Sequence, residues 1–159
     1  MQFLTLLTCA VPALASAIPQ ADTATLNPVT GLPADYTWAV ENWHAGCSRG
    51  GCNYNFNITG AYEGLRPGFK AYCNGEDTGY YAPCEILDGT STSGIPFVAA
   101  SLRPNSGNGI ATMSASLSFT DADSGVTYNI SGWADSKYNA FVAPLQNFTV
   151  TPSQVTSVL

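Results

Sequence analysis

Charged side chains are scarce in this 159-residue sequence. Asp, Glu, Lys and Arg together make up 10% of it, against roughly 25% in an average globular domain. Five residues are Lys or Arg and eleven are Asp or Glu, so the formal net charge is −6. A protein that binds nucleic acid or an anionic membrane surface needs a basic stripe to neutralise phosphates. The composition therefore disfavours both kinds of partner.

Histidine is almost absent as well, because His44 is the only one. Nucleophilic catalysis by a hydroxyl needs a base, usually His, that a third group orients. His44 lies beside Trp43 and shortly before Cys47, and we interpret it as a structural residue. The sequence therefore predicts no nucleophilic catalytic set.

The carboxylates do not indicate a catalytic site any more clearly than the single histidine does. Glycoside hydrolysis needs two of them at a fixed distance across a cleft, and Glu41, Glu63 and Glu85 are the glutamates near predicted strands. Without a motif, we interpret these scattered acids as solvated charges. Asp121 and Asp123 resemble the start of a calcium-binding loop, but the glutamate that such a loop has at its twelfth position is missing. We therefore interpret these residues as part of a turn. We predict no enzyme, no metal site and no cofactor.

One apolar run, Phe3–Ala15, precedes the small-x-small pattern Ala15-Ser16-Ala17 that signal peptidase accepts. The run has about a dozen residues, whereas a permanent bilayer anchor needs about 20. We therefore predict a signal peptide over residues 1–17. The mature chain is expected to be secreted, extracellular and soluble.

Cysteine usage fits that compartment. Cys9 leaves with the signal, so four cysteines remain, an even set in an oxidising environment. Four cysteines allow three connectivities. We favour Cys47 with Cys52 and Cys73 with Cys84, because each pair is local and encloses turn residues. A zinc site is disfavoured, because the spacings do not match the usual ligand pattern.

The dominant hydrophobic period is two, which indicates strands with one buried and one wet face. Apolar and polar residues alternate over 53–58, 112–119 and 126–131, and the last two segments flank a turn, Asp121–Gly125. Gly and Pro interrupt every candidate helix. We predict an all-β chain with about eight short antiparallel strands, either a barrel or a sandwich. The expected parts are a flexible leader (18–34), a β domain (35–152) and a tail (153–159).

Amphipathic aromatics are the candidate binding residues, since they supply rigid contact area. Core packing is the alternative interpretation for Tyr72, Tyr80, Tyr81, Trp133 and Tyr138. The Tyr80-Tyr81 doublet stands out, because adjacent strand residues face opposite ways and one ring must leave the buried face. We predict Tyr80, Tyr81 and Trp133 as binding residues.

Three sequons are candidate glycosylation sites: Asn57, Asn129 and Asn147. Their number is close to what chance gives. Position says more, because Asn57 and Asn129 fall on the polar faces of alternating strands. A glycan at either is expected to point to solvent without disturbing the core.

Several of these features together resemble the fungal Alternaria major-allergen-like family. They are the exported leader beginning Met1-Gln2-Phe3, the segments 35–40 and 54–58, and the Cys73–Cys84 pair around Tyr80-Tyr81. The resemblance implies a small secreted β-barrel protein without enzymatic motifs, of a kind that in some cases elicits or modulates plant defence. That family's founding type has a further cysteine near the mature amino terminus that links two chains. None occurs between Ile18 and Gly46 here, so a covalent dimer of that design is not expected.

The functional hypothesis is a non-enzymatic secreted fungal protein, effector-like, elicitor-like or allergen-like, that binds a host or cell-wall protein or polysaccharide through its surface. The alternative is a small carbohydrate-binding or carbohydrate-active secreted protein. A purely structural wall protein is a third interpretation.

Overall fold

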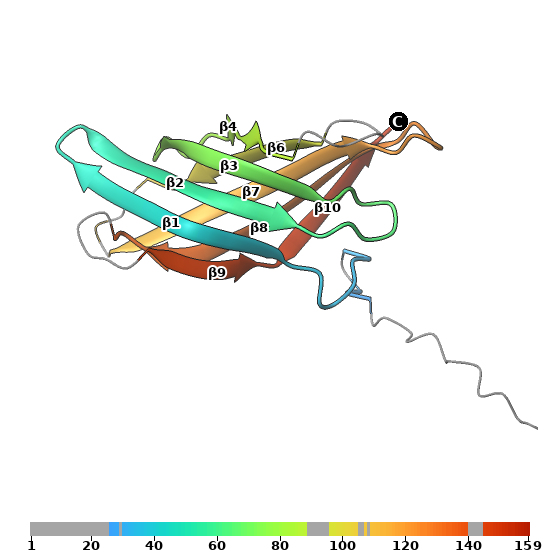
Figure 1. The fold of residues 1–159 in the computed structure, drawn as a ribbon, viewed down its shortest axis with the longest axis horizontal. Helices are drawn as coiled ribbons and strands as arrows, with labels where there is room; N and C mark the ends of the chain where they lie inside the picture. Colours follow the sequence, from blue (N-terminus) through green and yellow to red (C-terminus); the bar gives the residue numbers. More distant parts are fainter. Residues whose placement is uncertain (1–25, 29, 89–95, 105–106, 108, 140–144) are drawn as a thin grey trace, which may run out of the picture.

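The computed structural model of the chain is built of β-strands (Figure 1). Within the residues that it describes there are ten strands and no helix, which confirms the all-β prediction. The described residues are 26–28, 30–88, 96–104, 107, 109–139 and 145–159. The strands are β1 Trp38–Ser48, β2 Gly51–Gly60, β3 Phe69–Glu76, β4 Ala82–Pro83, β5 Glu85–Ile86, β6 Phe97–Leu102, β7 Ile110–Thr120, β8 Thr127–Lys137, β9 Gln146–Val150 and β10 Pro152–Val158.

These strands form two five-stranded sheets that pack as a sandwich. The first sheet has the order β5-β3-β2-β1-β9 and the second β10-β8-β7-β6-β4. Every pairing between named strands is antiparallel. Of the two predicted architectures, the sandwich fits.

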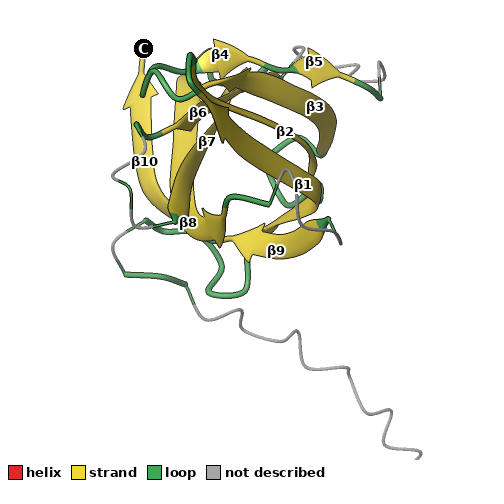
Figure 2. Cartoon of the chain, turned by 90° about the vertical axis from the view of Figure 1, so that its left-hand side faces the viewer, coloured by secondary structure: helices red, strands yellow, loops and turns green. Residues whose placement is uncertain are grey.

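The chain crosses between the sheets at both edges. Cys84 separates β4 in the second sheet from β5 in the first, and Thr151 separates β9 in the first from β10 in the second. Figure 2 shows the strands around the core, with β4 and β5 along one side and β9 on the opposite side. At each of these two edges, a single residue therefore connects a strand of one sheet to a strand of the other.

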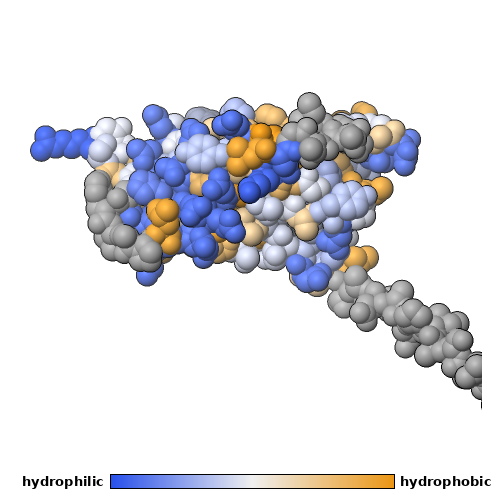
Figure 3. All heavy atoms as spheres, in the orientation of Figure 1, coloured by the Kyte–Doolittle hydropathy of each residue, from blue (hydrophilic) through white to orange (hydrophobic). Residues whose placement is uncertain are grey.

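Alternation along the strands fills the space between the sheets. On β2, Tyr54, Phe56 and Ile58 are each at most 2% exposed, while the asparagines between them face outward. The eleven residues of β7 alternate in the same way. Burying each large apolar side chain stabilises the fold by roughly 1.5 to 3 kcal/mol. The face in Figure 3 is correspondingly mostly hydrophilic, with small separate apolar patches.

A β-bulge in β1 changes which side chains point inward. Asn42 has a positive φ of 57°, a conformation that Asn tolerates better than most residues, and the register shifts there. The extra residue brings the Trp43 side chain into the core, where it is 0% exposed. Strict alternation from Val40 would place Asn42 inward instead.

The β7–β8 hairpin closes as predicted from its turn residues. The Asp121 backbone N–H donates to the carbonyl of Val126, and the Ser124 N–H donates to the Asp121 carboxylate at 3.2 Å. The Ser124 hydrogen bonds lower the pKa of Asp121 below its usual value. Gly125 supplies a positive φ of 70°. The side chain of Asp121 thus caps the turn, as the turn interpretation requires.

The ordered structure begins earlier than the predicted domain start at residue 35. Between Asn27 and Leu32 a backbone hydrogen bond of 2.7 Å closes a compact turn, and the Leu32 side chain, 3% exposed, joins the core. The prediction of a flexible leader is therefore wrong for the described residues from 26 onward, because Leu32 is anchored by burial. The predicted signal peptide, 1–17, and residues 18–25 lie outside the described residues.

The predicted tail, 153–159, is also corrected. β10 spans Pro152–Val158 and pairs with β8, with Val155 opposite Ile130. Backbone pairing and the half-buried Val155 side chain hold the segment, although it alternates too weakly to be recognised as a strand. The domain therefore extends to residue 158.

Candidate functional site

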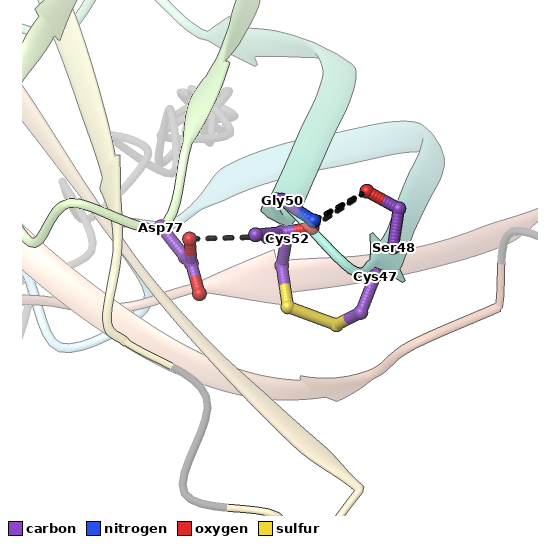
Figure 4. The surroundings of a disulfide bond; sticks show 6 residues. Cys47, Ser48, Gly50, Cys52 and Asp77 are labelled. Atoms are coloured by element: carbon purple, nitrogen blue, oxygen red, sulfur yellow. Dashed lines mark hydrogen bonds between the residues drawn. A yellow bond between two sulfur atoms is a disulfide. The ribbon is translucent and has the colours of Figure 1, made fainter.

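The two disulfides have the predicted pairing. Cys47 is bonded to Cys52 and Cys73 to Cys84. The first bridge joins directly opposite residues at the tip of the β1–β2 hairpin. Figure 4 shows Asp77 beside it, with the carboxylate oxygen Oδ1 accepting a hydrogen bond from the Cys52 N–H at 3.1 Å. The Asp77 N–H in turn donates to the Cys52 carbonyl at 3.0 Å.

Asp77 begins the loop that carries Tyr80 and Tyr81. The Gly79 N–H donates to the carbonyl of Leu102 on β6, and the Tyr80 N–H donates to the Thr78 hydroxyl at 3.3 Å. Beyond the loop, Ala82 pairs with β6. Both ends of the five-residue loop are therefore fixed to neighbouring strands.

Both tyrosine rings are exposed, Tyr80 at 81% and Tyr81 at 49%. The sequence argument placed them on a strand, with one ring inward and one outward. That geometry is wrong, because both residues lie in the loop between β3 and β4, where alternation does not apply. Tyr72 and Tyr138 are half-buried.

Trp133 lies on the outward face of β8 and is 56% exposed. It lines a pocket of about 370 Å³ with five residues from two other segments: Asn27, Thr30, Thr151, Pro152 and Ser153. Sequence reasoning missed all five, because it assigned Asn27 and Thr30 to the leader and did not connect 151–153 with Trp133.

Gly132 explains why β10 begins so close to Trp133. It pairs with Pro152, and a Cβ atom on Gly132 would lie 2.8 Å from the Thr151 carbonyl oxygen. Only a residue without a side chain permits this approach.

The outward face around Trp133 is polar and largely uncharged. Ser114 of β7 is directly opposite Trp133, and the register places further small polar residues on the same face. Hydroxyls and amides pair across the strands, as in Ser116 with Asn129 and Ser131 with Gln154. The uncharged polar residues of this face on β7, β8 and β10 are Thr112, Ser114, Ser116, Ser118, Thr120, Thr127, Asn129, Ser131, Gln154 and Thr156.

The predicted binding residues do not form one site. Tyr80 and Tyr81 precede β4, at one edge of the second sheet, and β6 and β7 lie between β4 and the strand that carries Trp133. The Trp133 pocket is not lined by either tyrosine. The chain therefore presents two separate aromatic surfaces, the Tyr80–Tyr81 loop and the Trp133 pocket.

Of the acids considered for glycoside hydrolysis, Glu41 and Glu85 lie on β1 and β5 of the first sheet and Glu63 lies in the loop between β2 and β3. Glu41 is opposite Asn57, Asn57 is opposite Tyr72, and Tyr72 is opposite Glu85. Three inter-strand spacings of about 4.8 Å put the outer two backbones roughly 14 Å apart, whereas catalytic carboxyl groups lie roughly 5 to 9.5 Å apart. Two other side chains fill the row between Glu41 and Glu85, so the register does not present them as a pair.

Ser48 has a spacing that sequence reasoning overlooked, because Gly46-Cys47-Ser48-Arg49-Gly50 matches G-x-S-x-G. In hydrolases this motif needs a strand-to-helix elbow. Here Ser48 lies at a hairpin tip, where its hydroxyl donates to the Gly51 carbonyl and accepts from the Gly50 N–H at 3.3 Å. His44 is bonded instead to the Asn55 amide, 3.4 Å from its Nδ1. The residues that match G-x-S-x-G therefore form a hairpin turn and not a catalytic elbow.

The three sequon asparagines lie on strands. Asn57 is half-buried on β2, while Asn129 and Asn147 are exposed. The Asn147 Oδ1 accepts a hydrogen bond from the Asn42 N–H at 2.9 Å. Glycosylation at all three stays a prediction.

Across the described part of the chain, no group of three or more His, Cys, Asp and Glu residues is placed to hold a metal ion. Nor does any segment there form a helix that is long and apolar enough to cross a membrane. Comparison of the chain with family models, curated proteins and solved structures finds no match. The resemblance to the Alternaria major-allergen-like family therefore stays a prediction.

Proposed function

We propose that this protein acts outside the cell as a non-enzymatic binding protein that attaches to a host or cell-wall surface, in the manner of an effector, elicitor or allergen-like protein. The exposed Tyr80–Tyr81 loop carries this proposal. Two exposed tyrosines supply a large amphipathic contact area at low entropic cost.

The loop is preorganised by its surroundings. Asp77 holds its start against the Cys47–Cys52 hairpin, and the hydrogen bond from Gly79 holds its middle to β6. The Cys73–Cys84 bridge spans the whole loop from β3 to the crossing between the sheets. A rigid contact loop loses less conformational entropy on binding than a mobile one.

The compartment is consistent with this proposal. Two disulfide bonds are compatible with an oxidising, extracellular environment. They also keep a small domain folded where chaperones are absent, since each bridge of this length stabilises by roughly 2 to 3 kcal/mol.

Binding is favoured over catalysis by where the perturbed groups lie. In the described chain, burial raises the pKa of Tyr36, Tyr54 and Tyr138, and the turn bonds of Asp121 lower its pKa. Catalytic groups with shifted pKa values normally cluster in a cleft. These four groups belong instead to the packed interior, its margin and a turn.

Retention of the purified mature protein by surface material tests the proposal. We expect isolated cell walls or immobilised host extracellular proteins to deplete it from solution. The double variant Tyr80→Ala with Tyr81→Ala is expected to lose at least about tenfold in affinity, because exposed aromatic anchors dominate such contacts.

Tyr62→Ala is the matched control, because Tyr62 is 74% exposed in the β2–β3 loop and should not affect retention. Two outcomes contradict the proposal. One is a wild-type protein that no such surface retains. The other is hydrolysis of wall polysaccharides or esters that is lost when Glu41 or Glu63 is neutralised.

A further inference from the structure

The Trp133 pocket has the composition of a binding site for an uncharged, amphipathic ligand. Its aromatic wall is an indole that is 56% exposed. A surface tryptophan that is not covered by the protein leaves its apolar face in water, and a ligand with an apolar face removes that cost. The other residues that line the Trp133 pocket, apart from Pro152, carry hydroxyl or amide groups.

These polar groups have hydrogen-bonding capacity to offer. The Thr30 hydroxyl accepts a bond from the Leu32 N–H at 3.3 Å, and a hydroxyl retains its own proton as a donor. Thr151 and Ser153 are exposed, so their hydroxyls are accessible from the pocket. A small number of placed polar groups beside an aromatic ring is the usual make-up of a small-molecule site.

Both walls of the pocket are held in place. One is the turn that the buried Leu32 side chain anchors to the core. The other is the start of β10, where Pro152 is buried and paired with Gly132. The site is therefore formed before a ligand arrives, which favours affinity.

Charge narrows the class of ligand. None of the six lining residues is ionisable, so the pocket offers neither a cation for an acidic group nor a carboxylate for a basic one. The nearest ionisable side chain along this face of β8 is Asp135, whose carboxylate accepts a hydrogen bond from Thr112. Because the net charge of the chain is −6, a polyanion is disfavoured further.

The surface next to the pocket suits an extended polar ligand. From Trp133 the face continues over Ser114, Ser116, Ser131 and Gln154, which are directly or diagonally adjacent across β7, β8 and β10. Small hydroxyl side chains project little from the sheet. A chain of sugar rings has an apolar C–H face for an aromatic ring and hydroxyls at its rim for such a surface.

We infer that the Trp133 pocket binds a neutral glycan, with one sugar ring stacked on the indole and its hydroxyls bonded to the Thr30, Thr151 and Ser153 side chains. This rests on the proposed function, since it names the ligand class of the second aromatic surface of a surface-binding protein.

Tryptophan fluorescence tests the inference directly. The chain has three tryptophans, and Trp38 and Trp43 are each 0% exposed. Quenching by acrylamide therefore reports mainly on Trp133. We expect neutral gluco-, manno- or chito-oligosaccharides to protect the emission from quenching, in a saturable way. The apparent affinity should not change between about 50 mM and about 500 mM NaCl, because no ion pair forms.

Variants locate the site. Trp133→Ala should weaken retention on the corresponding insoluble glycan at least about tenfold, and Trp133→Phe should restore part of it. Phe97→Ala is the matched control, because Phe97 is 57% exposed on the same face of the second sheet. It should bind as the wild type does. Circular dichroism confirms that each variant is folded.

The outcomes separate this inference from the proposed function. Retention by walls that survives Trp133→Ala but is lost in the Tyr80→Ala, Tyr81→Ala variant overturns the glycan site and leaves the proposed function intact. Absence of protection by every neutral oligosaccharide overturns the glycan site as well. Binding that falls steeply with salt overturns the neutral ligand class. A wild-type protein retained by no surface and protected by no glycan overturns both.

Discussion

At the scale of single residues, Asn139 is a side chain that binds the backbone of β1 directly after its bulge. It is 6% exposed. Its Oδ1 accepts from the Ala45 N–H and its Nδ2 donates to the Trp43 carbonyl, both at 2.9 Å. The amide thus takes the place of a partner strand beyond Trp43, where β9 no longer pairs with β1, and it satisfies two backbone groups at once.

Replacing this amide by a carboxyl group tests its role. In Asn139→Asp at neutral pH, the donor to the Trp43 carbonyl is lost and a charge is buried beside it, so we expect about 3 kcal/mol less unfolding free energy. Burial raises the pKa of this carboxyl in the folded state. Stability should therefore recover as the pH falls through that value, because the protonated acid donates again.

Denaturant unfolding from pH 7 to pH 4 measures this dependence. Asn55→Asp, at a half-buried position on the outward face of β2, is the control, and its loss should be smaller. If Asn139→Asp were as stable as the wild type at pH 7, the amide would not be what holds the backbone of Trp43 and Ala45.

At the scale of elements, the two disulfides differ in what they constrain. Cys47–Cys52 closes a hairpin that strand pairing already forms, with five residues of separation, whereas Cys73–Cys84 spans eleven and ties β3 to the crossing between the sheets. In the chain-entropy treatment the two losses are about 2.2 and about 2.8 kcal/mol. The structural consequences should differ more than these energies.

We predict that Cys73→Ala with Cys84→Ala loosens the Tyr80–Tyr81 loop, and that Cys47→Ala with Cys52→Ala does so much less. Limited proteolysis measures this, because cleavage after the loop tyrosines requires local opening. Faster cleavage is expected only for the first pair of substitutions. Equal cleavage rates in the two variants would show that the 73–84 bridge does not hold the loop.

The elements differ in how well the sequence predicts them. The turn end of the β7–β8 hairpin is predictable, since its two alternating runs and the Asp121–Gly125 turn are all local signals, but the run ends at residue 131 while β8 continues to Lys137. β10 is not, because its residues become a strand only by pairing with β8. The bulge at Asn42 is not either, because the Asn147 side chain that accepts a hydrogen bond from the Asn42 N–H lies 105 residues away.

In the candidate surfaces, too, local features are predictable from the sequence and long-range contacts are not. Tyr80, Tyr81 and Trp133 are recognisable as amphipathic aromatics, and all three are exposed. The other lining residues of the Trp133 pocket are Asn27, Thr30 and 151–153, which are separated from Trp133 in the chain. Only tertiary packing brings these segments together, so no local pattern could have predicted the pocket.

At the scale of the whole molecule, Tyr54 links the two sheets. Its side chain on β2 crosses the core, and its hydroxyl donates to the Ala100 carbonyl on β6 at 2.9 Å. Burial raises the pKa of Tyr54 from 10 to about 12. The folded state therefore holds this proton more tightly than the unfolded chain does.

This difference predicts a loss of stability in alkali. Below pH 10 the tyrosine is neutral in both states, and its contribution is fully present. As the pH rises from 10 to 12, the unfolded state ionises first, so the unfolding free energy falls by up to about 1.4 kcal/mol per pH unit. Tyr36 and Tyr138, whose pKa values burial also raises, act in the same direction.

Denaturant midpoints between pH 8 and pH 12 measure the effect. Tyr54→Phe should lower stability at pH 8 by about 1 kcal/mol, because the Ala100 carbonyl loses its donor, and should make the alkaline decline shallower. Tyr62→Phe, at an exposed ring, is the control and should leave the profile unchanged. A Tyr54→Phe decline as steep as that of the wild type would contradict the assignment.

The position of Asn129 has a consequence for a preparation of the protein as a population of molecules. Asn129 lies on the same outward face of β8 as Trp133, four residues earlier, which is roughly 14 Å along a strand. If this sequon is glycosylated and the Trp133 pocket binds glycans as inferred above, an N-linked oligosaccharide at Asn129 is within reach of the indole and competes with external ligands for it. Preparations from hosts that process this sequon differently would then share one affinity but differ in their fraction of active molecules, so glycoform composition, rather than sequence, would set their measured capacity.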